Sequence, residues 1–163
     1  MHQHPAARTA RSAPTLIPAL ALGLGVFALA SGAQGAKTLD GKTHTGVALT
    51  GTLDGHGEVP KGDPKGSGEF VLWVDAAKQQ ACYDLGVAGI GTPTAAHVHK
   101  GAAGVAGPPV IMLQTPTTLH AAACAPVTPD LAADLVAHPA DYYVNVHTAA
   151  FPGGAIRAQL MRK

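Results

Sequence analysis

Aromatic side chains, charged side chains and cysteine are all scarce in this sequence of 163 residues. Phe, Tyr and Trp make up only 4% of the chain, so any core must be built from small aliphatic residues. Lys and Arg number 11 against 10 Asp and Glu, and this balance excludes a protein that binds nucleic acid through clustered basic residues. The abundant residues are Gly (20) and Pro (13), which indicate many turns and short elements. The composition predicts a small, turn-rich β domain.

Residues 1–33 match the three-part pattern of a secretory signal peptide. Two arginines precede an apolar run over residues 16–30, and small residues follow it, so cleavage is expected after Ala30 or after Ala33. The alternative is an N-terminal membrane anchor. A run shorter than the ~20 residues that span a bilayer, interrupted by Pro18, favours cleavage. We therefore expect an exported protein, periplasmic or extracellular, with no stable membrane span.

Beyond the signal region, hydrophobic residues alternate with a period of two, which is typical of half-buried strands. Val47, Leu49 and Leu53, for example, fall on one side of a segment whose other side is small or polar. The expected strands cover residues 45–53, 70–75, 81–87, 95–99, 110–113, 142–148 and 155–160. Short strands separated by Gly and Pro predict an all-β fold, a Greek-key-like antiparallel β-sandwich.

One short helix is expected over residues 129–137. Thr128 can cap its N-terminus, and Pro129 suits the first helical position because its missing N–H has no partner there. Leu131 and Leu135 are spaced to lie on one helical face, and the helix ends before Pro139.

Cys82 and Cys124 are the only cysteines in the chain. In an oxidising compartment an even count is most simply explained by one disulfide bond. The alternative is a pair of free thiols or of ligands for a soft metal. Neither cysteine has a C-x-x-C partner, so the disulfide is favoured.

The candidate site consists of three histidines. His97 and His99 are two positions apart in an expected strand, so their side chains share a face with Cα atoms ~6.6–6.8 Å apart. Two imidazoles at that spacing can bind one copper or zinc ion. His147 lies in a second expected strand and can complete a three-histidine site if the two strands are neighbours. The alternative is that these histidines only form structural hydrogen bonds.

The other histidines of the expected mature chain lie in predicted loops or at element ends, where we expect solvated side chains: His44, His56, His120 and His138. No nucleophile elbow, zinc-protease motif, phosphate-binding loop or dinucleotide fingerprint occurs, so no catalytic residue and no organic cofactor is assigned.

Three segments resemble the CHRD (chordin-type) domain: residues 94–104, 107–113 and 142–160. Leu49-Thr50-Gly51 with Glu58-Val59-Pro60 is similar to the opening of that family, although Lys61 replaces a second proline. Ala158 also stands where the family usually has Gly. The resemblance implies a CHRD domain over residues 37–163, an exported β module found singly in bacterial proteins and repeated in chordin, a secreted binder of signalling proteins. It implies no reaction.

Three functions are consistent with these observations. The first is a metal-binding exported protein that uses His97, His99 and His147. The second is a non-catalytic structural or protein-binding module of the cell envelope, whose partner the sequence does not identify. The third is an enzyme like copper/zinc superoxide dismutase, whose Greek-key sandwich also has a strand with an H-x-H motif. The remaining ligands of that family are not matched in this sequence, so the similarity concerns the fold.

Overall fold

The computed structural model describes residues 36–37 and 43–163, which fall within one structural unit, Gly32–Lys163. The expected signal peptide and both cleavage positions lie outside the described residues. Within them the elements are β1 (Ala36–Lys37), β2 (Thr43–His44), β3 (Val47–Asp54), β4 (Ser67–Asp75), β5 (Gln80–Ala88), β6 (Pro93–Lys100), β7 (Pro109–Leu113), β8 (His120–Pro126), α1 (Pro129–Ala137), the 3-10 helix η1 (Pro139–Asp141), β9 (Tyr142–Thr148), β10 (Ile156–Gln159) and β11 (Met161–Arg162).

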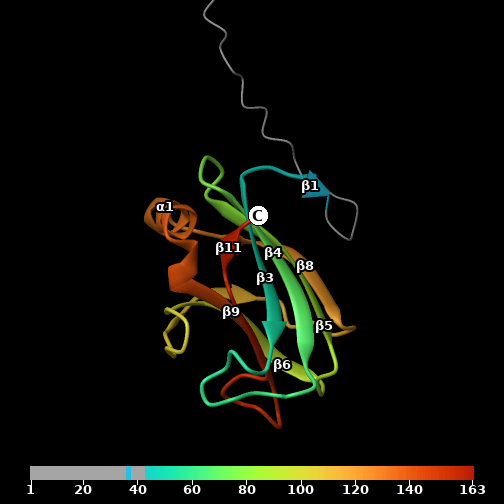
Figure 1. Cartoon of the computed structure of the whole chain (residues 1–163). Coiled ribbons are helices and arrows are strands. Elements are labelled where there is room, and N and C mark those ends of the chain that lie inside the picture. The colour runs from blue at the N-terminus through green and yellow to red at the C-terminus, as the bar shows by residue number, and fades with distance from the viewer. Residues whose placement is uncertain (1–35, 38–42) are drawn as a thin grey trace, which may run out of the picture. The chain divides into compact units, whose positions relative to one another are not determined.

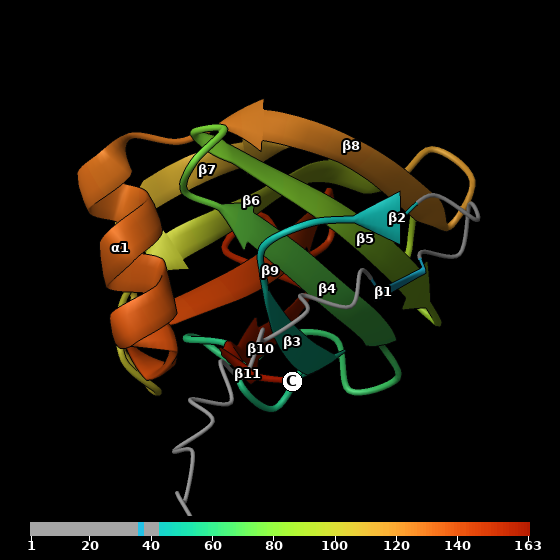
Figure 2. The same cartoon turned by 90° about the horizontal axis from the view of Figure 1, so that it is seen from above.

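The strands from β3 onward form one antiparallel sheet in the order β7-β6-β9-β10-β3-β4-β5-β8, with β11 beside β3 (Figure 1). The sheet has two halves, β7-β6-β9-β10 and β3-β4-β5-β8. They are joined narrowly, because β10 and β3 share a single register pair, Arg157 and Asp54. The sheet curves so that its end strands β7 and β8 approach each other (Figure 2). The backbone N–H of Gln114, which follows β7, donates to the Tyr83 hydroxyl of β5 over 2.6 Å. The predicted antiparallel β fold with one short helix is confirmed.

The core lies between the two halves and follows the period of two. Alternate residues of each strand point inward, and the side chains that they bury are mostly aliphatic. The inward-facing residues of the central strands are Leu49, Leu53, Phe70, Leu72, Val74, Tyr83, Leu85, Val98, Val144, Val146 and Ile156. Polar residues between them, such as Thr50 and Thr52, therefore face the outside of the sheet.

Helix α1 has the predicted bounds and the predicted cap. The Leu131 N–H donates to Thr128 Oγ1 over 3.2 Å, and Ala132 and Leu135 are fully buried. The helix lies next to the beginning of β9 (Figure 1). Within the described part of the chain, no helix combines the length and the hydropathy needed to cross a bilayer.

Replacing the cap residue tests how much this bond stabilises the domain. We expect Thr128→Ala to lower the free energy of unfolding by about 1 kcal/mol, because one N–H of the first helical turn loses its acceptor. Thr128→Ser keeps the hydroxyl and should stay close to wild type. Urea denaturation of the three proteins measures the difference, and an alanine variant as stable as the serine variant would contradict the prediction.

Strand β8 is the longest element that the sequence does not predict; the others are β1, β2, η1 and β11, which have two or three residues each. Its residues, His-Ala-Ala-Ala-Cys-Ala-Pro, include no β-branched residue and no Phe, Tyr or Trp, and so lack the usual preference for a strand. It forms because it pairs with β5 over seven register positions, one of which joins Cys82 to Cys124. Their sulfur atoms are bonded at 2.02 Å, so the predicted disulfide is confirmed.

Candidate metal site

The three candidate histidines lie on neighbouring strands. β6 and β9 pair antiparallel, with Ala95 opposite His147 and His97 opposite Asn145. His147 is therefore diagonal to His97, and residues two positions apart share a face of the sheet. The expectation that the strand of His97 and His99 lies beside the strand of His147 is confirmed.

Their ring nitrogens converge. His97 Nδ1 and His147 Nε2 are 3.2 Å apart, and one ligand atom from each of the three residues lies within 4.8 Å of the others. Two nitrogens bound to a tetrahedral ion at ~2.0–2.1 Å stand about 3.3–3.4 Å apart, so this pair already has the required spacing. The His99 ring lies slightly farther away, with its centroid 5.4 Å from that of His97 and 6.4 Å from that of His147.

Backbone carbonyls orient two of the rings. His99 Nδ1–H donates to the Gly107 carbonyl over 2.8 Å, and His147 Nδ1–H donates to the Pro152 carbonyl over 3.0 Å. A carbonyl can only accept, so each Nδ1 carries the proton and each Nε2 is left with a lone pair. In metalloproteins, the ring nitrogen of a ligand histidine that does not bind the metal usually donates to such an acceptor. This hydrogen bond orients the ring so that its other nitrogen faces the ion.

His99 Nε2 is the unusual atom of the cluster. It is buried and makes no hydrogen bond of ordinary geometry, although the Asn145 side chain lies close enough to act on the pKa of the ring. The His99 ring is stacked on Tyr143, with the ring centroids 4.7 Å apart and the planes 8° from parallel. Because a buried polar atom without a partner is costly, this nitrogen needs an explanation.

Burial also sets the charge of the cluster. It lowers the pKa of His97, and the charges of His147 and His99 lower it further. Burial lowers the pKa of His99 as well, and the charges of His147 and Arg157 act in the same direction, against the opposing effects of Gly107 and Asn145. Both shifts favour the neutral imidazole, which is the form that binds metal.

Three buried charged or polar residues surround the histidines, and the sequence alone did not place them at the site. Asn145, opposite His97, and Arg157, opposite Asn145 on β10, are almost fully buried, as is Glu58 from the loop between β3 and β4. Burial raises the pKa of Glu58, while Arg157 and a hydrogen bond from Asn145 act to lower it. Glu58 and Arg157 both lie in segments that resemble the CHRD domain, which is the one signal that the sequence offers for them.

Arg157 holds the glycine-rich loop between β6 and β7 (residues 101–108) against this face of the sheet. Its guanidinium donates to the carbonyls of Val105 (3.0 Å) and Ala102 (2.8 Å) and lies 3.4 Å from the centre of the Tyr143 ring. The same loop supplies the Gly107 carbonyl that orients His99. Arg157 therefore positions the loop on which the His99 geometry depends.

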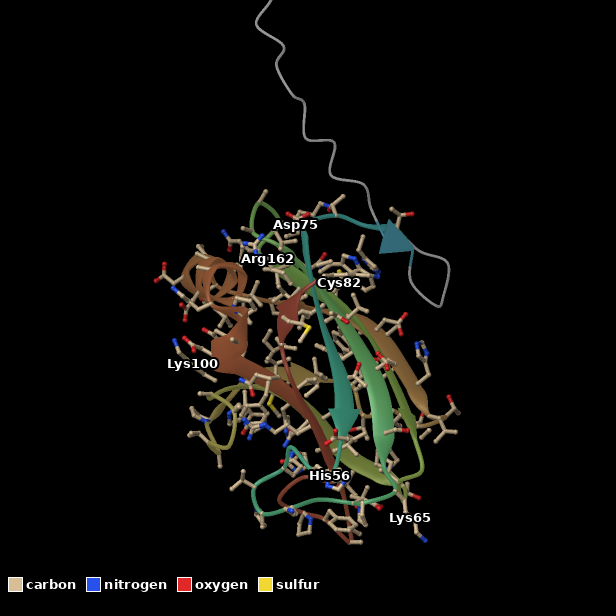
Figure 3. The ribbon with its side chains drawn as sticks, in the orientation of Figure 1. His56, Lys65, Asp75, Cys82, Lys100 and Arg162 are labelled. Atoms are coloured by element: carbon tan, nitrogen blue, oxygen red, sulfur yellow. A yellow bond between two sulfur atoms is a disulfide. The ribbon has the colours of Figure 1, made fainter. Side chains whose placement is uncertain are left out.

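The four other histidines differ from one another. His56 and His138 are exposed as expected, and His56 lies on the loop between β3 and β4 (Figure 3). His120 lies at an element end as expected, the first residue of β8, but its side chain is not simply solvated: its Nε2 lies 2.5 Å from Oδ1 of the buried Asp84. His44 is half-buried, with its ring 5.0 Å from the Trp73 ring. These two contacts join strands distant in sequence, so local spacing does not reveal them.

Three imidazole donors can hold one copper or zinc ion and leave a coordination position open, a combination that suits storage, transport or chemistry at the ion. A family model described as the CHRD domain matches residues 49–160, a range that includes all three histidines and both cysteines. Comparisons with curated proteins and with solved structures give no significant match.

Proposed function

Since the chain belongs to the CHRD-domain family, an assignment that carries no reaction with it, we propose that the protein is exported and binds one copper or zinc ion through His97, His99 and His147. The observation that carries the proposal is the buried Nε2 of His99, which has no hydrogen-bond partner beside two other imidazoles. A metal ion accounts for that lone pair, because it would be the partner that the protein itself does not supply.

The donor set favours copper and zinc over the hard cations. All three donors are imidazole nitrogens, which suit copper and zinc, whereas magnesium and calcium prefer oxygen ligands. Two of the three ligands are already oriented by the carbonyls of Gly107 and Pro152. The movement that binding requires is the approach of the His99 ring, whose ligand atom lies within 4.8 Å of the others.

Export is part of the same proposal. The N-terminal pattern of residues 1–33 predicts a signal peptide, and a disulfide bond such as Cys82–Cys124 is typical of oxidising compartments. Copper is therefore a reasonable first ion to test, although the residues alone do not choose between copper and zinc.

Titration of the metal-free protein with Cu(II) and with Zn(II), followed by calorimetry, tests the proposal. We expect one ion per wild-type chain and no high-affinity ion in His97→Ala/His99→Ala. Binding should weaken on acidification because protons compete for the ligands. Since burial lowers the pKa of both His97 and His99, their competition should begin below the ordinary value of ~6.5.

The matched control is His56→Ala/His138→Ala, which removes two histidines from exposed positions. It should bind metal like wild type, and circular dichroism of both double variants checks that the fold is kept. Equal metal uptake by the two double variants would contradict the proposal. The three histidines would then have a structural role, in which His97 Nδ1–H donates to His147 Nε2. That result would favour a structural or protein-binding module.

A further inference from the structure

A second group of metal-ligating residues lies at the disulfide, on strands other than those of the three-histidine site. Trp73, Cys82 and Cys124 are directly opposite one another on β4, β5 and β8. His44 of β2 lies against the Trp73 ring, and one of its ring nitrogens is within 4.8 Å of both sulfur atoms. Imidazole and two cysteine sulfurs therefore meet at one point of the outer sheet surface.

Space for an ion adjoins this point. A cavity of about 80 Å³ is bordered by His44, Cys82, Gln80, Asp75 and Lys78, among others. Because one water molecule occupies ~30 Å³ of liquid, the cavity can hold an ion together with a water ligand. Asp75 and Cys82 lie near the same end of the sheet in Figure 3. Lys78 Nζ lies 3.1 Å from Asp75 Oδ2 and balances that negative charge, so two thiolates would have to supply the charge that attracts a cation.

The disulfide is open to reduction from one side. Cys124 is exposed on the end strand β8, whereas Cys82 is 8% exposed. A dithiol reductant can attack the Cys124 sulfur: the S–S bond breaks, Cys82 leaves as a thiol, and the second thiol of the reductant then releases Cys124. The reductant becomes a disulfide, and the protein gains two electrons and two protons. Gln80 Oε1, 3.5 Å from Cys82 Sγ, is in place to accept from the new thiol.

We propose that reduction of Cys82–Cys124 opens a second metal site, in which the two thiolates and the His44 imidazole bind a soft or borderline ion such as Zn(II), Cd(II) or Cu(I). A divalent ion displaces one proton from each thiol, and the neutral His44 ring donates its lone pair. The sheet keeps the two sulfurs close after the bond breaks, because residues 82 and 124 stay opposite each other, with Cα atoms 3.9 Å apart in the oxidised form. A tetrahedral ion at ~2.3 Å from each sulfur needs the sulfurs about 3.7–3.8 Å apart, which a rotation of the side chains can provide.

This site is independent of the three-histidine site, since the two share no residue. It also differs in chemistry: the thiolate site exists only in the reduced protein, whereas the imidazole site needs no redox change. The oxidation state of the disulfide therefore decides whether the protein holds one ion or two.

Cd(II) is a suitable probe because thiolate binding produces a charge-transfer absorption in the ultraviolet that imidazole binding does not. The test uses the His97→Ala/His99→Ala protein, which removes the first site, and a phosphine as reductant. We expect one Cd(II) per reduced chain with this absorption, and no such absorption for the oxidised chain. Adding His44→Ala should weaken Cd(II) binding at least about tenfold, the smallest effect usual for a group that merely orients a ligand. Adding His138→Ala instead, an exposed histidine, should leave the affinity unchanged.

Two results would overturn the proposal: no charge-transfer band in the reduced, folded protein, or equal affinity with and without His44. Circular dichroism establishes whether the reduced protein stays folded. If it unfolds, Cd(II) should restore the β-sheet spectrum of the chain that retains His44 and not of the His44→Ala chain. Failure to restore it, or equal restoration of both, would also overturn the proposal.

Discussion

Cys82→Ala/Cys124→Ala is expected to lower the free energy of unfolding by about 4 kcal/mol. The two cysteines are 42 positions apart, and in the chain-entropy description a closed loop of that size removes about this much conformational freedom from the unfolded chain. The bond also holds β8 to β5, and β8 is an alanine-rich end strand whose side chains bury little apolar surface. Urea denaturation of variant and wild type measures the change.

Reduced wild-type protein in the presence of a chelator is the control for this substitution. It should match the double alanine variant, because both lack the cross-link and the chelator removes any ion bound by the thiols. A loss below about 1 kcal/mol in both proteins would contradict the loop-closure explanation. It would show that β8 is held by its strand pairing alone.

The second large effect is expected for Arg157→Met, which should lower the free energy of unfolding by about 3 kcal/mol. Arg157 is 4% exposed, and its loss removes the donors to the Ala102 and Val105 carbonyls and the positive charge near the buried Glu58. The estimate is at the low end for a buried charged group, because residues 102–105 are exposed and water can reach their carbonyls when the loop lifts.

Two comparisons make this prediction specific. Arg162→Met removes an exposed arginine of β11 that donates to the Val136 carbonyl over 2.9 Å, and it should change the stability by no more than about 0.5 kcal/mol. Adding Glu58→Gln to Arg157→Met should recover about 1 kcal/mol, since it removes the carboxylate left without a nearby positive charge. An Arg157→Met protein as stable as Arg162→Met would contradict the assigned role.

Several predictions from local pattern were confirmed, and each has a physical reason. Alternation fixes which residues of a strand share a face, so Leu49 and Leu53 are buried together. A cap hydroxyl followed by proline, with leucines spaced to share one helical face, predicts where a helix begins, as at Thr128. Two cysteines allow one pairing, so the export signal was sufficient to suggest the Cys82–Cys124 bond.

Strand β8 shows where local pattern fails. Its alanines give no preference for a strand, and the segment becomes one because β5 offers a free edge in register with it. For the same reason, His120 was expected to be a solvated residue in a loop or at an element end. Its position on β8, opposite Gly86 and beside Asp84, depends on a pairing between residues more than thirty positions apart.

By itself, the sequence determined an antiparallel β fold with one helix, the pairing of the two cysteines and the placement of His97 and His99 on one face of a strand. Only the tertiary structure decided that β6 lies beside β9, which brings His147, fifty positions away, within 3.2 Å of His97. It also decided that the carbonyls of Gly107 and Pro152 orient two of the rings. The physical reason is that side-chain periodicity is a property of a few consecutive residues, whereas strand order depends on how the whole chain closes its core.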